Sequence, residues 1–409
     1  MAHVPVRHPG GRPAGVQNGS PAVLPLESTA YTARMDETNE LRAWLLALRT
    51  PGLGPGGLRE ALAAADGRID AVPAWLRRHA TTLDEGAAAW LDAPDEARLA
   101  ADLAWLAGPG HRLLRCTEAD FPPLLETIPQ PPAALFVAGD AGLLLRPQVA
   151  IVGARGAGPA GLDHARSFAR ALALAGFTVT SGMAEGVDGA AHEAALDAGA
   201  ATIAVVGTGP DRVYPRKHHA LAQRIAAQGA LVSEFPPGTA ARADHFPRRN
   251  RIIAGLALGT VVVEAGLQSG SLITARLAGE QGREVFALPG SIANPLARGC
   301  HRLIRDGARL VEEPTEVAEA LAPAARALGV ELAERLSRPD APLQARDGGW
   351  RDDPDYRRLL EALGHDPATL DALVQRSGLA PAALSSMLLM LELEGRVAGL
   401  AGNRYQRLP

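Results

Sequence analysis

Apolar side chains in residues 36–145 recur every three or four positions, which is the spacing of a buried helix face. One such stripe consists of Leu41, Trp44, Leu45 and Leu48. The pattern predicts a helical N-terminal domain over 36–145. Residues 1–35 are rich in Gly, Pro, Ser and Ala and lack an apolar period, so we expect a disordered tail there, with Met35 as an alternative start.

A glycine-rich turn at residues 50–62 lies between two apolar helical stretches of this domain. It is similar to the hairpin of helix–hairpin–helix modules, whose turn amides can contact a phosphate. A plain connection between helices explains the same residues, and both readings stay open.

Residues 146–327 alternate short β-branched apolar runs with amphipathic helical stretches. The runs predict strands at 149–152, 178–180, 202–206, 230–232, 260–263 and 285–287. Apolar strands separated by helices are typical of an α/β domain whose parallel sheet is covered on both faces. Ligands bind such sheets beyond the carboxyl ends of the strands.

The last part of the chain predicts a small separate domain. Residues 328–354 have no period and indicate a linker, and residues 355–409 predict a winged helix with helices at 356–363, 369–376 and 381–394 before a hairpin. The third helix has no basic residue and offers Ser385, Ser386 and an apolar row with Met387 and Leu391. A duplex reader usually presents Arg, Asn or Gln there, so we expect a protein-interaction or accessory module.

Charge is distributed unevenly along the chain. The net charge is −4, yet residues 210–309 carry 14 Lys+Arg against 7 Asp+Glu, an excess of +7, which leaves −11 for the rest. Such a basic segment can attract a polyanion to one face. No apolar run approaches the roughly 20 residues that cross a bilayer, and no secretory signal is visible, so we expect a cytoplasmic protein without a membrane partner. Cys116 and Cys300 have no metal-binding spacing and are expected to be free thiols.

The first glycine-rich motif follows the strand at 149–152. Gly156, Gly158 and Gly161 spell the dinucleotide fingerprint, but they begin three residues too late, and the next strand ends in Ser181 rather than an acid. We therefore expect no nucleotide cofactor. The turn and the helix begun at Pro159 can instead bind an anion, with Arg155 as its clamp.

The second motif, residues 180–196, places Ser181 and Gly182 where a bound backbone could approach closely. Asp188 is expected to cap the next helix, and His192 lies one turn later. We favour the interpretation that Asp188 and His192 bond to each other or to the backbone. Catalysis by the pair is the alternative. No second histidine completes a helical zinc motif.

Two further motifs supply cations. Arg216 and Lys217 open a helix, where basic residues oppose the dipole, which hints at function. Tyr214 before them can stack on a base or pack under the loop. In residues 245–257, three arginines crowd around Asn250 at a helix start, and their forks suit phosphate oxygens. These arginines are Arg248, Arg249 and Arg251.

The last motif, residues 261–278, contains Glu264 at a strand end and a small polar lip formed by Ser269, Gly270 and Thr274. Glu264 is expected to accept hydrogen bonds from a nearby arginine or loop amides, and a catalytic acid is the alternative. The glycine turns, helix N-termini and basic side chains together predict one rim that holds a run of phosphates rather than a single one.

These blocks resemble the DNA-processing protein A family, also called Smf. The stretches VAIVGAR, TSGMAEGVDGAAH, FPRRNRIIAGL and VVVEAGLQSGSLITA follow one another in family order. The resemblance implies an extended Rossmann-like fold without a cofactor, dimerisation through that domain, single-stranded DNA binding and loading of a RecA-type recombinase during natural transformation. It also implies a helical domain of SAM or helix-hairpin-helix type and a C-terminal winged helix. The residues it assigns to DNA are Arg155, Ser181, Gly182, Arg216, Lys217, Arg248, Arg249, Asn250, Arg251, Ser269, Gly270 and Thr274.

Two function classes therefore compete. The first is a non-enzymatic DNA binder that protects the strand and serves a recombinase. The second is a nucleotide-processing enzyme similar to phosphoribohydrolases, with Glu264 as its acid, although the Pro-Gly-Gly loop of those enzymes is missing.

Overall fold

The computed structural model describes residues 26–78, 85–337, 354–364 and 367–379, together with residues 384, 387, 388, 391, 397–400 and 404–407. Residues 338–353 of the expected linker (328–354) and residues 1–25 of the expected tail lie outside these residues. The linker prediction was wrong for residues 328–336, because they belong to helix α13 (Pro314–Leu336). Within the described residues, no helix is long and apolar enough to cross a membrane.

The N-terminal region forms a helical cluster around the predicted apolar stripe. Its helices are α1 (Leu26–Leu48), α2 (Pro55–Ala64), α3 (Val72–Arg78), α4 (Glu85–Asp92) and α5 (Glu96–Leu106), with a short 3-10 turn η1 (Ile69–Ala71). Trp44 and Leu45 are fully buried among apolar side chains of the other helices. Helix α1 begins at Leu26, so the prediction of a disordered tail through residue 35 was wrong for its last ten residues.

Two strands interrupt the region that was expected to be helical. Strands β1 (His111–Arg115) and β2 (Ala134–Gly139) flank the short helix α6 (Pro123–Glu126) and pair antiparallel. β2 also pairs antiparallel with β6 (Ala230–Ser233), which extends the sheet by two strands. The expectation of a helical stretch to residue 145 was therefore wrong, and the expected parallel sheet carries two antiparallel strands at one edge. Runs as short as HRLLR and ALFVAG do not reveal by periodicity whether they form a strand or a helix.

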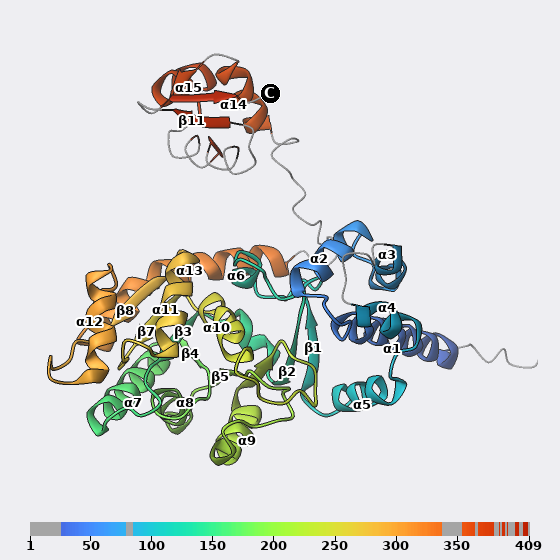
Figure 1. Cartoon of the computed structure of the whole chain (residues 1–409), viewed down its shortest axis with the longest axis horizontal. Helices are drawn as coiled ribbons and strands as arrows, with labels where there is room; N and C mark the ends of the chain where they lie inside the picture. The colour runs from blue at the N-terminus through green and yellow to red at the C-terminus, as the bar shows by residue number, and fades with distance from the viewer. Residues whose placement is uncertain are drawn as a thin grey trace, which may run out of the picture.

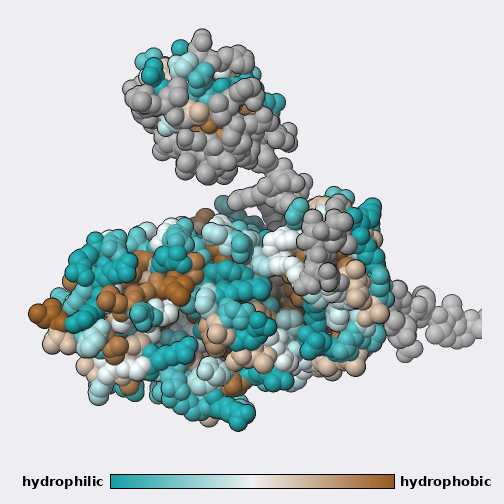
Figure 2. All heavy atoms as spheres, in the orientation of Figure 1, coloured by the Kyte–Doolittle hydropathy of each residue, from teal (hydrophilic) through white to brown (hydrophobic). Residues whose placement is uncertain are grey.

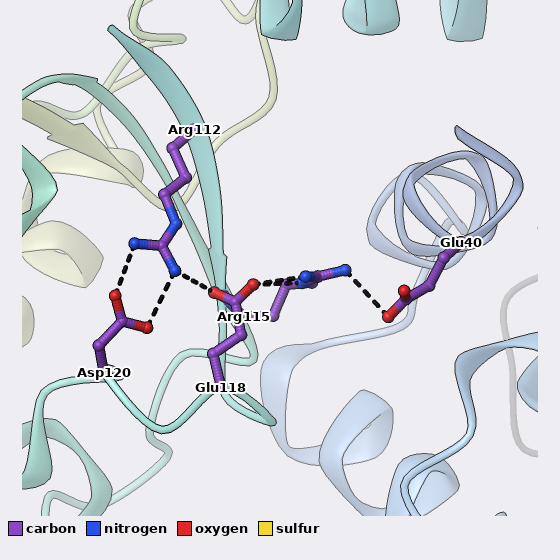
Figure 3. A network of polar contacts seen from close by, with 5 residues as sticks. All are labelled: Glu40, Arg112, Arg115, Glu118 and Asp120. Atoms are coloured by element: carbon purple, nitrogen blue, oxygen red, sulfur yellow. Dashed lines mark hydrogen bonds and ion pairs between the residues drawn. The ribbon is translucent and has the colours of Figure 1, made fainter. Parts of the chain in front are cut away.

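Strands β1 and β2 carry the helical cluster on the sheet. Leu113 and Phe136 pack into the core of the helical cluster. Figure 3 shows the polar contacts beside it, where Arg112 binds Asp120 through two bonds of 2.6 and 2.9 Å. Arg115 bridges Glu118 on its own turn and Glu40 on α1, with nitrogen–oxygen distances of 2.5 and 2.9 Å. The edge strand β1 is thereby tied to α1.

All six predicted strands are confirmed, and each strand end lies within one residue of its predicted position. They are β3 (Gln148–Val152), β4 (Thr178–Ser181), β5 (Thr202–Val205), β6, β7 (Gly259–Val262) and β8 (Glu284–Ala287), followed by a short β9 (Arg309–Leu310). The strand order is β1-β2-β6-β5-β4-β3-β7-β8-β9, and every neighbour from β6 to β9 runs parallel. The chain builds outward from β3 in one direction and from β7 in the other. The switch point where ligands bind open α/β sheets therefore lies between β3 and β7.

Helices cover both faces of the sheet (Figure 1). One face is packed by α10 (His245–Leu256), α11 (Gly270–Glu280) and α12 (Arg298–Arg305), and the other by α7 (Pro159–Leu174), α8 (Val187–Asp197) and α13 (Pro314–Leu336). Helix α9 (His219–Gln228) follows the short turn η4 (Arg216–His218) and packs beside α8. Two more 3-10 turns, η3 (Ala141–Leu145) and η5 (Pro295–Ala297), complete the body.

The C-terminal residues form the winged helix that the sequence predicted. Helices α14 (Pro354–Leu363) and α15 (Leu370–Ser377) pack with a sheet of order β10-β12-β11, made of β10 (Ala368–Thr369), β11 (Val397–Leu400) and β12 (Arg404–Arg407). In the expected third helix, the four described residues are helical and buried: Leu384, Met387, Leu388 and Leu391. Its apolar row is therefore core. Ser385 and Ser386 lie outside the described residues.

Candidate nucleic-acid interface

A cavity of about 870 Å³ opens at the switch point. Its walls come from the turn after β3, the loop after β4, the first turns of α10 and the N-terminus of α11. Arg155, Arg249, Asn250, Ser269, Gly270 and Thr274, all expected at the site, line this cavity. Half of the twelve residues assigned from the sequence therefore lie around this one cavity.

Arg155 is an exposed cation of this cavity. It lies in the loop between β3 and α7, and its guanidinium carbon is 5.7 Å from the centre of the Phe246 ring. The Tyr214 ring also packs against Phe246, with ring centroids 5.5 Å apart, and 46% of Tyr214 is exposed. The arrangement offers a cation and aromatic surface side by side, as proteins that hold single strands do.

A second hollow of about 600 Å³ adjoins the first one. Tyr214 and Ala241 belong to the walls of both, and Arg212 and Arg216 line only the second. Tyr214 therefore stands between two basic depressions. Whether it stacks on a base stays a prediction, but packing under the loop does not account for its exposed area.

Arg249 is buried in the floor of the cavity instead of reaching outward. Its Nη1 donates to the carbonyl oxygen of Gly182 at 2.6 Å and also to that of Val205. Burial lowers the pKa of Arg249 to about 10, although the nearby Asp188 carboxylate acts in the opposite direction. A Cβ on Gly182 would lie 2.6 Å from this guanidinium, so the glycine makes room for Arg249. The expectation that Gly182 admits a bound backbone was wrong, because the space is filled.

Asp188 and Ser181 have structural roles as well. Asp188 accepts hydrogen bonds from the amides of Gly182 and Ala184 at 3.1 and 3.3 Å, while Gly186 occupies the N-cap of α8. Its expected capping role was therefore wrong, and its expected bonding to backbone is confirmed. Burial raises the pKa of Asp188. The Ser181 hydroxyl is buried and donates to the Ile151 carbonyl at 2.6 Å, which turns it away from any ligand.

His192 does not pair with Asp188. Its Nδ1 lies 2.8 Å from the Thr202 hydroxyl, and its Nε2 is buried without a hydrogen-bond partner among the described residues. Burial lowers the pKa of His192 to about 3, so the ring is neutral. A neutral ring held in the core between α8 and β5 does not suit catalysis.

Arg248 and Arg251 lie on a different face of α10 from Arg249. Both pair with one carboxylate, Glu234 at the end of β6, and the Nε of Arg248 lies 2.9 Å from it. Arg251 and Glu234 are buried, whereas the side chain of Arg248 is 44% exposed and lies over the Phe235 ring. The prediction that the three arginines converge on one rim was therefore wrong. Glu234 was missed because its partners lie 14 and 17 residues away.

Two other assigned residues, Lys217 and Ser269, contact neighbouring side chains. Lys217 is exposed and pairs with Glu185 at 2.8 Å, and this contact lowers the pKa of Glu185. Ser269 is the N-cap of α11 and contacts the Ser271 hydroxyl at 2.7 Å. Arg212 and Arg242 also line the hollows but were not assigned from the sequence. Arg212 lies just before the motif at 214–217, and Arg242 lies just before the arginine-rich start of α10.

Glu264 is a structural acceptor, as expected. Its carboxylate accepts from the Gly158 amide and from Asn294 Nδ2, both at 3.1 Å. Gly161 of α7 covers it, because a Cβ there would lie 2.5 Å from the carboxyl carbon. The Glu264 carboxylate therefore holds the loop after β3 in place, and Glu264 is not among the residues that line the cavity.

Comparison with known proteins gives the family. The family described as DNA recombination-mediator protein A matches residues 112–322, just over half of the chain. The chain belongs to this family. A second match, to the DprA winged helix domain, covers residues 310–403.

Members of this family from several bacteria are similar over most of their length. Protein Smf of Escherichia coli is 43% identical over 309 residues, which are 75% of this chain and 80% of that protein. DNA processing protein DprA of Streptococcus pneumoniae is 45% identical over 193 residues, which are 47% of this chain and 68% of that protein. The X-ray structure of DprA from Streptococcus pneumoniae superposes with a TM-score of 0.59 at 34% identity, covering 68% of this chain and 96% of the other.

Proposed function

We propose that this protein binds single-stranded DNA at the switch-point cavity and the hollow beside it, without catalysing a reaction. The observation that carries the proposal is the line formed by Arg155, Phe246, Tyr214 and Arg216, where exposed cations flank exposed aromatic surface. Unstacked bases have faces for such rings and successive phosphates for such cations. Family membership and the relatives that carry the name DNA processing protein support the same conclusion.

The cations of the rim differ in how available they are. Arg155 and Arg216 form no ion pair among the described residues, whereas Lys217 and Arg242 pair with Glu185 and Asp244. We assign the phosphate contacts first to Arg155 and Arg216. Arg249, Asn250 and Thr274 shape the cavity into which a base or sugar fits.

A salt-series titration tests this assignment. Wild-type protein is expected to prefer single-stranded over double-stranded oligonucleotides, with affinity that falls steeply with salt. Arg155→Ala is expected to lose about 1.5–3 kcal/mol of binding and about 0.7 from the log–log salt slope, since one phosphate contact disappears. Arg170→Ala, which removes an exposed arginine of α7, is the matched control. Equal affinity and slope for Arg155→Ala and wild type would reject the site.

We also propose that the bound strand is passed to a RecA-type recombinase in the cytoplasm, and that the protein acts as a homodimer. Exposed apolar side chains support a protein partner at the end of the body that carries α12, where Figure 2 shows hydrophobic atoms gathering. Leu267, Ile292 and Leu310 are 51%, 85% and 44% exposed. Exposed apolar surface of this kind marks association sites. Order-of-addition assays with a recombinase and coated single-stranded DNA test the transfer, and no acceleration of filament formation would reject it.

A further inference from the structure

The segment between β6 and α10, residues 235–243, forms one wall of both hollows. Ala240 lines the smaller hollow, Ala241 lines both, and Arg242 lines the larger one. This wall has no helix or strand of its own, and residues 240–243 are exposed. Its position therefore depends on the contacts that hold its base.

Two of these contacts come from the neighbouring loop after β5. The Gly238 amide donates to Asp211 Oδ1 at 2.8 Å, and the Gly209 amide donates to the Thr239 carbonyl at 2.9 Å. Both anchors come from the loop that itself lines the smaller hollow.

The third contact comes from the helical cluster. Arg49, directly after α1, donates from Nη2 to the carbonyl of buried Pro237 at 2.8 Å, 188 residues along the chain. The same guanidinium binds both oxygens of Asp102 on α5, at 2.5 and 2.7 Å. The side chains of Arg49 and Asp102 are only 11% and 2% exposed. A planar fork held in this way has one orientation and presents its third contact in a fixed direction.

We propose that Arg49 is a positioning residue, through which the helical cluster sets the wall of the DNA-binding hollows. Arg49 is buried behind Pro237 and does not touch the strand. It acts by fixing the Pro237 carbonyl, three residues before Ala240, which is the first residue of this segment to line a hollow. The inference rests on the proposed single-stranded DNA binding, and it gives the helical cluster a role in that binding without a phosphate contact of its own.

A positioning residue leaves a signature that a direct contact does not. Loss of a phosphate contact lowers both the affinity and the salt slope, since fewer counterions are released. Loss of positioning lowers the affinity while the number of phosphate contacts, and hence the slope, stays the same.

The test uses the full-length double variant Arg49→Met with Asp102→Leu, which replaces the buried pair by apolar side chains. Arg77→Met with Asp92→Leu is the control for exchanging an arginine–aspartate pair for apolar side chains, because this more exposed pair and the Leu91 carbonyl that Arg77 also binds lie entirely within the helical cluster. We expect the first variant to bind a single-stranded oligonucleotide about 3- to 30-fold more weakly at every salt concentration, with an unchanged slope. Backbone amides of residues 238–243 are expected to exchange hydrogen faster, and the control is expected to match wild type in both measurements.

Two results would overturn the inference: affinity equal to wild type, or a reduced salt slope that reveals a direct contact. If the double variant does not fold, Arg49→Lys replaces it, since an ammonium keeps a charge for Asp102 but lacks the fork that also reaches Pro237. Arg49→Lys is expected to weaken binding with an unchanged slope, and wild-type affinity in this variant also overturns the inference. Failure of wild-type protein to bind the oligonucleotide would instead reject the proposed function.

Discussion

The arginines around the cavity have different roles in this protein, and burial separates them. Arg249 and Arg251 are buried and satisfy carbonyl oxygens or Glu234, whereas the exposed Arg155 on another loop faces solvent beside aromatic rings. A buried guanidinium without a partner is very costly, so the internal contacts of Arg249 and Arg251 cannot be given up to a ligand. We therefore expect these two residues to support the site without contacting a bound strand.

Removal of Arg251 is therefore expected to affect stability rather than binding. Arg251→Met leaves the buried Glu234 with Arg248 alone, and we expect a loss of about 3 kcal/mol in the free energy of unfolding. Arg248→Met, at a half-exposed position, is expected to cost less than about 1 kcal/mol. Urea unfolding of both variants measures this difference. Wild-type stability combined with lost oligonucleotide binding in Arg251→Met would show that Arg251 contacts DNA.

The floor of the cavity depends on a glycine. Gly182→Ala places a Cβ within 2.6 Å of the Arg249 guanidinium, which must then leave the Gly182 and Val205 carbonyls. We expect a loss of about 1–3 kcal/mol in stability. Gly156→Ala is the control, because a Cβ there meets no atom within 4 Å. Thermal unfolding compares the two, and equal melting temperatures would contradict the role given to Gly182.

The sequence predicted which residues gather at the site better than it predicted what each one does. Glycine turns and strand ends correctly placed Arg155, Asn250 and Ser269 around one cavity. The sequence did not show that Ser181 points into the core or that Glu234 takes up Arg248 and Arg251. Partners far apart in sequence become visible only once the strands are ordered.

At the scale of elements, predictability followed the sequence surroundings of the apolar runs rather than their length, since the missed β1 and β2 are longer than β4 to β8. Strands β3 to β8 are apolar runs bounded by glycine and separated by clear helices, so their positions were predicted almost to the residue. Strands β1 and β2 lie among helical stretches, where a five- or six-residue run has no distinguishing period. β1 pairs antiparallel with β2, and β2 with β6, through contacts that no local pattern encodes.

His192 of helix α8 is buried against Thr202 of strand β5, and it makes the free energy of unfolding depend on pH. Burial lowers the pKa of His192 from 6.5 to about 3, so between these values the unfolded chain binds one more proton than the folded chain. Stability is then lost as pH falls below 6.5, and His192 accounts for about 2 kcal/mol between pH 7 and pH 5. His192→Gln is expected to show a pH dependence smaller by this amount in urea unfolding.

His164→Gln serves as the control for this experiment, because His164 is exposed on α7. It is expected to keep the pH dependence of wild type. A His192→Gln variant that loses as much stability as wild type between pH 7 and pH 5 would show that the buried ring is not the source.

At the scale of the whole molecule, the basic segment at 210–309 has a weaker field than its sequence implies. Several of its cations are neutralised by internal partners, and three of these partners are Glu185, Asp197 and Glu234. Because exposed, unpaired cations dominate phosphate binding, the strand is expected to contact few phosphates on each subunit. A second subunit would double that number and lengthen the path of the strand.

Dimerisation is therefore expected to matter for affinity, and the exposed apolar end of the body allows a direct test. Ile292 is 85% exposed beside α12, and burial of such a side chain contributes about 1.5–3 kcal/mol. Ile292→Asp is expected to shift the protein toward monomer in sedimentation velocity and to weaken binding of long oligonucleotides more than of short ones. Val330→Asp, 61% exposed on α13, is the control. An unchanged sedimentation coefficient for Ile292→Asp, with wild type dimeric, would place the subunit contact elsewhere, whereas equal losses in both variants would show that the charge alone is responsible.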